Sequence, residues 1–224
     1  MINELSKTFW QKYASKSDLS LFSMMNLQKD PALSQQKFYY ELEIVLRECV
    51  FNDAQSLLDL GGGVGLWSRE FLKIVREVTL VEREPLFIEK AKSLLSNEKR
   101  CRIVNADSTT YYEKKNFDII FMSGLTIYLD DTSFNKMLEN INAMSRKRTE
   151  IIHRDAFGIE ERFFINEKQS EALGEKYSAQ YRTRQEYDDL FAQHGYQKSF
   201  DIDMYPDDQR WVETDLRLAK YIKL

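Results

Sequence analysis

The sequence predicts an α/β fold in which helices wrap a doubly wound, mostly parallel sheet. Short apolar runs alternate with helical segments over residues 56–153, an order that is typical of parallel sheets covered by helices. Four of the eight glycines gather within residues 61–65, directly after the first apolar run. Two strand-like runs joined by a short proline-containing loop occupy residues 199–224 and predict an antiparallel hairpin at the end of the sheet.

The first fifty residues carry a helical pattern. Asp30 followed by Pro31 is typical of a helix start, because aspartate caps the first turn and proline fits its first position. Apolar residues then recur at helical spacing: Phe38, Leu42, Val45 and Leu46. We expect residues 1–52 to form a helical lid and residues 53–224 to form one globular domain.

The remaining elements follow in order along the chain. Five short apolar runs predict the parallel strands: Ser56–Leu60, Val78–Glu82, Arg102–Ala106, Phe117–Met122 and Thr149–His153. The segments between them predict three helices: Trp67–Val75, Pro85–Leu95 and Asp131–Met144. An initial proline supports the second helix and an aspartate cap supports the third. A further helix is predicted over Arg184–Gln193, and it ends at Gly195.

Composition limits the class of protein. The 224 residues suffice for one sizeable domain and a lid, and the 43% of hydrophobic residues excludes a wholly disordered chain. The formal charge of −4 provides no basic excess, which argues against nucleic acid as a partner. Cys49 and Cys101 are too few for a disulfide framework and have no metal-ligand spacing.

The chain shows no sign of a targeting or membrane segment. Its first residues, MINELSKTFWQKY, lack the apolar core of a signal peptide. The longest mostly apolar run, at residues 117–129, is too short and too interrupted to cross a bilayer. We therefore expect a soluble, cytoplasmic protein that has no membrane partner.

The strongest local signal is LLDLGGGVGLWS at residues 57–68, in which a buried-type strand leads through glycines into a helix. A ligand held there would lie at the carboxyl end of the strand, where open α/β sheets bind ligands. The dinucleotide pattern G-x-G-x-x-G fails, because Leu66 or Ser68 stands at its last position. The pattern that fits is acid-x-G-x-G-x-G, which begins at Asp59 and runs through Gly61, Gly63 and Gly65.

Two acidic residues follow the next strands in register with this loop. Glu82 ends the second predicted strand, where a carboxylate can accept hydrogen bonds from both hydroxyls of a ribose. Asp107 and Ser108 follow the third strand, where an acid and the flanking backbone can meet an adenine ring. Each acid alone is equally well explained as a helix cap, but the two together favour a nucleoside site.

These features resemble the class I S-adenosylmethionine-dependent methyltransferases. The resemblance rests on Asp59-Leu-Gly61-Gly-Gly63-Val-Gly65, Glu82, Ala106-Asp107-Ser108 and the segment FDIIFMSGLTIYLDD from Phe117 to Asp131. It covers the chain from about residue 56 to its last residue and implies a Rossmann-like sheet of seven strands with an antiparallel last strand. A weaker likeness, in HRDAFGIEERF at residues 153–163, is to small methyltransferases of bacterial surface-polysaccharide biosynthesis.

The resemblance implies S-adenosylmethionine as the cofactor and assigns residues to it. Asp59 would approach the methionine amino end, the loop at residues 61–65 would pass under the cofactor, Glu82 would hold the ribose and Asp107 the adenine. The segment FWQKYA would form a variable lid in which Tyr13 contacts the cofactor. The cofactor-binding candidates are therefore Tyr13, Asp59, Gly61, Gly63, Glu82, Asp107, Ser108 and Ser123.

His153 and Asp155 are the candidate catalytic residues. His153 ends the fifth predicted strand, and Asp155 lies two residues on, hence on the same face if the chain stays extended. A carboxylate beside a histidine fixes its tautomer, which is the arrangement of an oriented general base. The alternative is a solvent-facing strand end without a catalytic role. The second histidine, His194, lies at a helix end and fits a structural role.

A long insert beyond the fifth strand, at residues 155–187, lacks regular apolar periodicity, and loops at this edge of a sheet often carry specificity. Arg162, Arg182 and Arg184 of this insert, and Arg154 just before it, could bind an anion, and Tyr177 and Tyr181 could pack on a ring, although charged loop residues are more often simply solvated. The substrate-binding candidates are Arg154, Arg182, Arg184 and Tyr181. A helix cap explains Asp131, and no histidine or glutamate set accompanies it, so we expect no metal.

The expected function is O-methylation of a small polar or anionic acceptor, such as a sugar or a phosphorylated precursor, with surface polysaccharide as one setting. One alternative is a nicotinamide-dependent reductase. Tyr111 and Lys115 have the Y-x-x-x-K spacing of such enzymes, but the pair precedes the fourth strand and does not follow the fifth, so the match looks accidental. The other is a nonenzymatic module that binds the cofactor to stabilise a partner. The identity of the acceptor, its reacting atom and the oligomeric state stay open.

Overall fold

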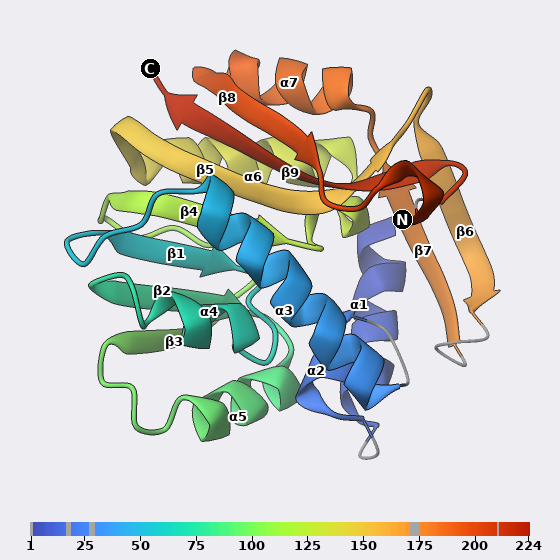
Figure 1. Ribbon diagram of the computed structural model, residues 1–224, viewed down its shortest axis with the longest axis horizontal. Helices are drawn as coiled ribbons and strands as arrows, with labels where there is room; N and C mark the ends of the chain where they lie inside the picture. Colours follow the sequence, from blue (N-terminus) through green and yellow to red (C-terminus); the bar gives the residue numbers. More distant parts are fainter. Residues whose placement is uncertain (1, 17–18, 27–29, 171–174, 210) are drawn as a thin grey trace.

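A seven-stranded sheet runs through the molecule (Figure 1), shown by a computed structural model that describes residues 2–16, 19–26, 30–170, 175–209 and 211–224. Its strands are β1 (Ser56–Leu60), β2 (Glu77–Glu82), β3 (Cys101–Asn105), β4 (Phe117–Ser123), β5 (Ser145–Gly158), β8 (Tyr196–Asp203) and β9 (Thr214–Lys223). They lie in the order β3-β2-β1-β4-β5-β9-β8. Strands β1 to β5 pair in parallel, whereas β9 pairs antiparallel with β5 and β8. The predicted sheet with a reversed last strand is confirmed.

Helices cover both faces of this sheet (Figure 1). One face carries α3 (Pro31–Glu48), α4 (Leu66–Phe71) and α5 (Pro85–Leu94), and the other carries α6 (Asp131–Ala143) and α7 (Arg184–Gln193). A 3-10 turn, η1 (Thr126–Tyr128), lies between β4 and α6. The α/β expectation is thus confirmed, with β5 longer and α4 shorter than the sequence predicts.

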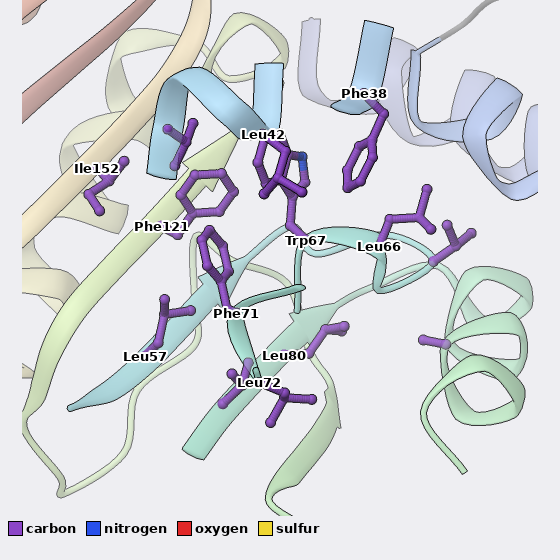
Figure 2. Close-up of a cluster of buried hydrophobic side chains, with 14 of the residues drawn as sticks. Phe38, Leu42, Leu57, Leu66, Trp67, Phe71, Leu72, Leu80, Phe121 and Ile152 are labelled. Carbon is purple, nitrogen blue, oxygen red and sulfur yellow. The ribbon is translucent and has the colours of Figure 1, made fainter. Parts of the chain in front are cut away.

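Aromatic rings fix α3 and α4 to the sheet (Figure 2). The ring of Trp67 lies with its centroid 5.0 Å from that of Phe38 on α3 and 5.0 Å from that of Phe121 on β4. Phe71 is fully buried against Phe121, at 4.8 Å. Each such ring contributes about 1.5–3 kcal/mol by its burial. The start of α4, and with it the glycine loop, is therefore held rigidly over β1.

The order of the strands reverses at β1: β2 and β3 lie on one side of β1, and β4 and β5 lie on the other. In open parallel sheets, the two strands beside such a reversal leave a crevice at their carboxyl ends, where ligands bind. Gly61 and Gly62 both donate their backbone N–H to the carbonyl oxygen of Val81, at 2.9 and 3.1 Å, which ties the loop after β1 to the end of β2. The glycine loop therefore lies at this crevice.

The insert after β5 forms a hairpin of its own. Strands β6 (Phe163–Ser170) and β7 (Glu175–Tyr181) pair antiparallel as a separate two-stranded sheet, which stands at the side of the molecule next to the first helix (Figure 1). Tyr177 of β7 packs on Phe9, with ring centroids 6.3 Å apart. The sequence does not predict these two strands, because their polar and apolar residues follow no clean alternation.

The N-terminal segment is helical, with α1 (Ile2–Ala14), α2 (Leu21–Asn26) and α3. The side chain of Asp30 accepts hydrogen bonds from the backbone N–H groups of Ala32 and Leu33, as its capping role requires. Leu46, expected on the apolar stripe of α3, is 41% exposed, whereas Glu41 is only 3% exposed. The buried face of α3 therefore includes a carboxylate.

Candidate functional site

A cavity of about 250 Å³ lies at the carboxyl ends of the central strands, below the N-terminal helices. The helices contribute Trp10, Met24, Met25 and Glu41 to its lining. The ends of β1, β2 and β3 contribute Gly61, Gly63, Val81, Glu82, Arg83, Ala106 and Ser108. The ends of β4 and β5, with η1, contribute Ser123, Gly124, Leu125, Ile127, Tyr128, Arg154, Asp155 and Ala156. One cavity therefore joins the predicted nucleoside residues to the predicted acceptor end.

The glycine loop forms the floor of this cavity. Gly61 and Gly63 have backbone φ angles of +71° and +54°, which residues other than glycine rarely adopt. A Cβ at Gly63 would lie 2.8 Å from Sδ of Met25, so a side chain there would have to displace the end of the Met25 side chain.

Glu82 is the acidic residue that the cavity exposes at the end of β2. Its carboxylate accepts backbone hydrogen bonds from Gly63 (3.0 Å), Arg83 (2.8 Å) and Glu84 (2.8 Å). Burial raises the pKa of Glu82, and these three bonds oppose that rise. The oxygens are held in a fixed orientation on the cavity wall, which suits a bidentate contact with a diol.

Asp59 lies beneath the loop and not on the cavity wall. It is 1% exposed, and its Oδ2 accepts a 2.6 Å hydrogen bond from Ser68 at the start of α4. Burial raises the pKa of Asp59 to about 7, with Ser68 lowering it and Glu82 raising it further. In this structure Asp59 fixes the strand-to-helix turn.

The end of β3 brings Ala106 and Ser108 to the cavity, with Asp107 between them. The carboxylate of Asp107 accepts from the backbone N–H (2.9 Å) and hydroxyl (2.6 Å) of Thr109, and it pairs with Arg83 at 3.4 Å. Burial raises the pKa of Asp107, but the Thr109 bonds and Arg83 bring it below its usual range. The carboxyl group of Asp107 is therefore ionised, and it lies beside the cavity.

Four side chains from distant segments meet at the other end of the cavity. Arg154 of β5 donates to Oγ of Ser123 at 3.0 Å and forms an ion pair with Glu41 of α3. Tyr205, in the loop after β8, donates its hydroxyl to Glu41 at 2.8 Å. The predicted residues Ser123 and Arg154 are thus brought together, along with a lid carboxylate that the sequence analysis missed.

Asp155 also lines the cavity, and its carboxylate organises the turn after β4. Oδ2 accepts from the backbone N–H groups of Leu125 (3.2 Å) and Thr126 (2.8 Å) and from the Thr126 hydroxyl (2.8 Å). Burial raises the pKa of Asp155, but the neighbouring His153 and Thr126 lower it below its ordinary value. Asp155 therefore stays ionised at the acceptor end.

His153 lies behind Asp155, on the side away from the cavity. The Thr126 hydroxyl gives its one proton to Asp155, so His153 must donate from Nε2 to that hydroxyl oxygen, 3.0 Å away. Within the described parts of the chain, Nδ1 of His153 has no hydrogen-bond partner. The ring is fully buried against Phe157 and Tyr187. His153 is not among the residues that line the cavity, and its role as a general base stays a prediction.

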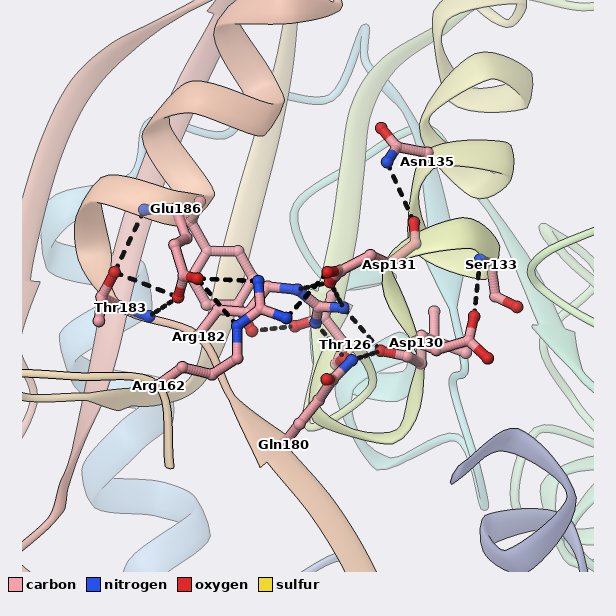
Figure 3. Close-up of polar contacts among 12 residues, drawn as sticks. Thr126, Asp130, Asp131, Ser133, Asn135, Arg162, Gln180, Arg182, Thr183 and Glu186 are labelled. Carbon is pink, nitrogen blue, oxygen red and sulfur yellow. Dashed lines mark hydrogen bonds and ion pairs between the residues drawn. The ribbon is translucent and has the colours of Figure 1, made fainter. Parts of the chain in front are cut away.

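Arg182 likewise serves the turn after β4 (Figure 3). Its guanidinium donates to the carbonyl oxygens of Thr126 (3.1 Å) and Leu129 (2.8 Å) and to Oδ1 of Asp131 (2.7 Å). Gln180 donates to the same Leu129 carbonyl. Arg182 is fully buried and its donors are engaged in this way, so the structure does not bring it to the cavity as an anion contact.

The other candidates from the insert and the lid also lie away from the cavity lining. Arg184 is half exposed and pairs with Asp201 at 3.4 Å, on the last hairpin. Tyr181 packs on Phe163, with ring centroids 5.8 Å apart. Tyr13 is buried and donates to the carbonyl oxygen of Ser23 at 3.2 Å, so its contact is with the lid itself.

The residues that sequence reasoning missed carry recognisable signals in hindsight. Glu41 lies three residues after Phe38 and four before Val45, both buried, so it occupies the apolar face of α3. A carboxylate on such a face is costly unless a partner is supplied. Trp10 lines the cavity, and its ring stands edge-on to that of Tyr128, with centroids 5.4 Å apart.

Two searches of the described residues give negative findings. Within the described ranges, no helix combines the length and apolar character that crossing a membrane requires. Among the same residues, no group of three or more histidine, cysteine, aspartate and glutamate side chains could hold a metal ion.

A family model described as a methyltransferase domain matches residues 57–148. Phosphoethanolamine N-methyltransferase of Triticum aestivum is 26% identical over 141 residues, which is 62% of this chain and 27% of that protein. The chain therefore spans about a quarter of the length of this curated relative.

Solved structures share the fold. Phosphoethanolamine N-methyltransferase 1 of Haemonchus contortus, in complex with phosphoethanolamine and S-adenosylhomocysteine, has a TM-score of 0.77 at 18% identity, over 98% of this chain and 49% of that one. N-methyltransferase NodS of Bradyrhizobium japonicum, with S-adenosylhomocysteine, has a TM-score of 0.67 at 13% identity, over 99% and 98%.

The cavity has features that suit a nucleoside, and both of these solved structures contain S-adenosylhomocysteine. Glycines with positive φ form its floor, an oriented carboxylate ends β2, and Ala106 and Ser108 border the place of an adenine. The glycine loop does not fit the dinucleotide-binding pattern, and the family model matches the strands around it. The fold shared with solved methyltransferase structures is consistent with both observations. Residues 57–148 match a methyltransferase domain, and the chain shares its Rossmann-like fold with solved methyltransferase structures.

Proposed function

We propose that this protein transfers a methyl group from S-adenosylmethionine to a small polar acceptor bound at the β4–β5 end of the cavity. The observation that carries the proposal is the single cavity, which runs from the glycine loop and Glu82 to Ser123, Arg154 and Asp155. The N-terminal helices form part of its wall, with Trp10, Met24 and Met25, and this partial cover supports a small acceptor. Water exclusion and alignment are the main requirements of such a transfer.

An amine is the acceptor that the charges favour first. The acceptor end holds two buried carboxylates, Glu41 and Asp155, against one guanidinium, Arg154. This excess of negative charge favours a cationic group over an anion. The N-methyltransferase activities in the names of the wheat and nematode relatives support an amine as the reacting group.

The chain's own groups have distinct tasks in this proposal. The bound cofactor supplies a methyl group on a positively charged sulfur, which is a good leaving group. Glu82 holds the ribose, and the 61–65 loop lets the backbone approach the cofactor closely. Asp155 holds the acceptor nitrogen by a charge-assisted hydrogen bond, since its lowered pKa keeps it ionised. Ser123 and Arg154 complete the wall on which the acceptor is oriented.

O-methylation of a sugar or phosphorylated precursor is the second candidate. Nε of Arg154 is buried and has no hydrogen-bond partner in the described chain, so it could donate to an acceptor oxygen. Among the described residues that line the cavity there is no histidine, so a hydroxyl acceptor would find no imidazole base there. A hydroxyl acceptor would have to use a carboxylate such as Asp155 as its base, whereas an oxygen that is already ionised needs none.

Two measurements test the proposal. Calorimetry with S-adenosylhomocysteine comes first, and a panel of small amines, alcohols and phosphorylated compounds is then assayed with methyl-labelled cofactor. We expect product from amines only, with kcat/KM rising with pH as the amine loses its proton. Cofactor binding without transfer to any acceptor would instead support the nonenzymatic alternative.

A charge-matched pair of variants refines the assay. Asp155→Asn removes the proposed nitrogen contact, and we expect kcat/KM for the amine to fall about 10- to 100-fold. Asp53→Asn makes the same charge change in an exposed turn and should leave the rate unchanged. Equal rates in both variants would contradict the role of Asp155.

A further inference from the structure

The pairing of Glu41 with Arg154 is the least expected feature of the cavity wall. The Glu41 side chain is 4% exposed and that of Arg154 is 12% exposed, and both residues line the cavity. Tyr205 donates to Oε1 of Glu41 while Arg154 donates to Oε2, so each carboxylate oxygen has a donor. The lid, β5 and the loop after β8 thus converge on one carboxylate.

The guanidinium of Arg154 is only partly used. Arginine carries five N–H donors in a planar fork. One donor on Nη1 serves Ser123 and one on Nη2 serves Glu41, while the buried Nε has no partner within the described part of the chain. Arg154 therefore retains donors for a ligand, but its charge is already compensated.

A buried guanidinium without a counter-charge would attract any small anion, because an uncompensated charge in the interior is costly. Glu41 removes this attraction by standing where a ligand's anionic group would otherwise stand. Its placement needs α3, whose apolar residues Phe38 and Val45 pack beside it in the core. The carboxylate is therefore delivered by the lid and fixed by Tyr205.

We infer that Glu41 is a specificity-determining residue: it compensates the charge of Arg154 as an internal anion and thereby excludes small anionic acceptors from the β5 end of the cavity. The inference deepens the proposed function, on which it rests for the location of the acceptor. Its distinctive consequence is a gain, because removal of the Glu41 charge should create anion binding that the wild type lacks.

The test uses the full chain saturated with S-adenosylhomocysteine and inorganic phosphate as the probe. Glu41→Gln keeps the size and a hydrogen-bonding end but removes the charge. We expect it to bind phosphate about 10- to 100-fold more tightly than the wild type, by calorimetry or phosphorus NMR. Glu43→Gln, an exposed glutamate on the same helix, makes the same change in net charge and should bind like the wild type. Equal phosphate binding in the Glu41→Gln variant and the wild type would overturn the inference.

Further variants locate the bound phosphate and guard against loss of folding. Phosphate binding gained in Glu41→Gln must disappear in Glu41→Gln/Arg154→Met, and its persistence would also overturn the inference. Tyr205→Phe keeps both charges and removes one donor to Glu41, so it should show a smaller gain, of about 2- to 5-fold, even if Glu41→Gln does not fold. No gain in Tyr205→Phe would then count against the inference.

The acceptor assay separates this inference from the proposed function. If the wild type methylates amines and Glu41→Gln leaves the ratio of kcat/KM for amines and anions unchanged, only the inference fails. If the wild type methylates no acceptor, the proposed function fails, and the phosphate titration still reports on Glu41. A ratio that shifts towards anionic acceptors in Glu41→Gln, but not in Glu43→Gln, supports both.

Discussion

The hydroxyl oxygen of Thr126 lies 3.0 Å from Nε2 of His153, and its proton points to Asp155 instead. Tyr187 places its hydroxyl 2.8 Å from the same oxygen. The histidine is therefore a donor that holds the turn after β4 from behind. Asp155, on the cavity side of the same strand face, is the member of this group that can meet an acceptor.

His153→Ala should therefore lower stability more than rate. Loss of the buried ring leaves a void among aromatic side chains and one fewer donor to Thr126, so we expect the unfolding free energy to fall by about 2–4 kcal/mol. His194→Ala, at the half-buried end of α7, should cost less. Per folded molecule, methyl transfer should change less than about tenfold, and a loss of about 10²–10⁴-fold would restore the general-base role.

Glu82→Ala should weaken cofactor binding. Removal of a carboxylate that accepts hydrogen bonds from a ribose should cost about 1–3 kcal/mol in affinity for S-adenosylhomocysteine, measured by calorimetry. Glu77→Ala, at the opposite end of β2, is the matched control and should leave the affinity unchanged. Unchanged affinity in Glu82→Ala would remove the ribose assignment.

Arg182 and Arg184 are expected to respond differently although they are two residues apart. Arg182→Met leaves the buried carbonyls of Thr126 and Leu129 without their donor, and we expect a loss of about 2–5 kcal/mol in unfolding free energy. Arg184→Met removes only exposed ion pairs and should cost less than about 1 kcal/mol. Chemical denaturation of both variants is the measurement, and similar losses would contradict the turn-holding role.

Asp59 should make stability depend on pH. Its pKa is about 7 in the folded protein against 3.8 for an ordinary aspartate, so between these values the folded state holds a proton that the unfolded chain has released. Stability from this group is therefore present at low pH and lost as pH rises towards 7. Asp59→Asn removes that loss, so its unfolding free energy relative to the wild type should increase from pH 5 to pH 8. A difference that is flat across this range would contradict the raised pKa.

The central strands could be predicted because burial leaves a simple pattern. Each of β1, β2 and β4 is a short apolar run bounded by polar residues, and the glycine cluster marks the turn after the first of them. The β6–β7 hairpin could not be predicted, because its stability comes from contacts such as that of Tyr177 with Phe9, far away in the chain. Such long-range packing overrides local preference.

The site residues that lie at strand ends could be predicted from the sequence. The hydrogen-bond partners of individual side chains could not. Glu82 and the 61–65 loop follow from strand ends, so their place at the cavity is set by topology. The direction of Arg182 and the tautomer of His153 depend on carbonyl and hydroxyl groups of η1, which no spacing reveals. The same holds for Glu41, whose partners are 113 and 164 residues away.

The position of β9 has a consequence for the order in which the molecule folds. β9 pairs with β5 from Glu150 to Gly158 and also carries β8, so neither of those strands has its full set of partners until residues 214–223 are in place. The pairing of β5 with β9 must close the long segment between them, residues 159–213, and closing a long segment before its contacts form is slow. The glycine loop and Glu82 are therefore framed by strands that lie within residues 56–123, whereas β5, which carries Arg154 and Asp155, has its second neighbour only in the last strand of the sheet.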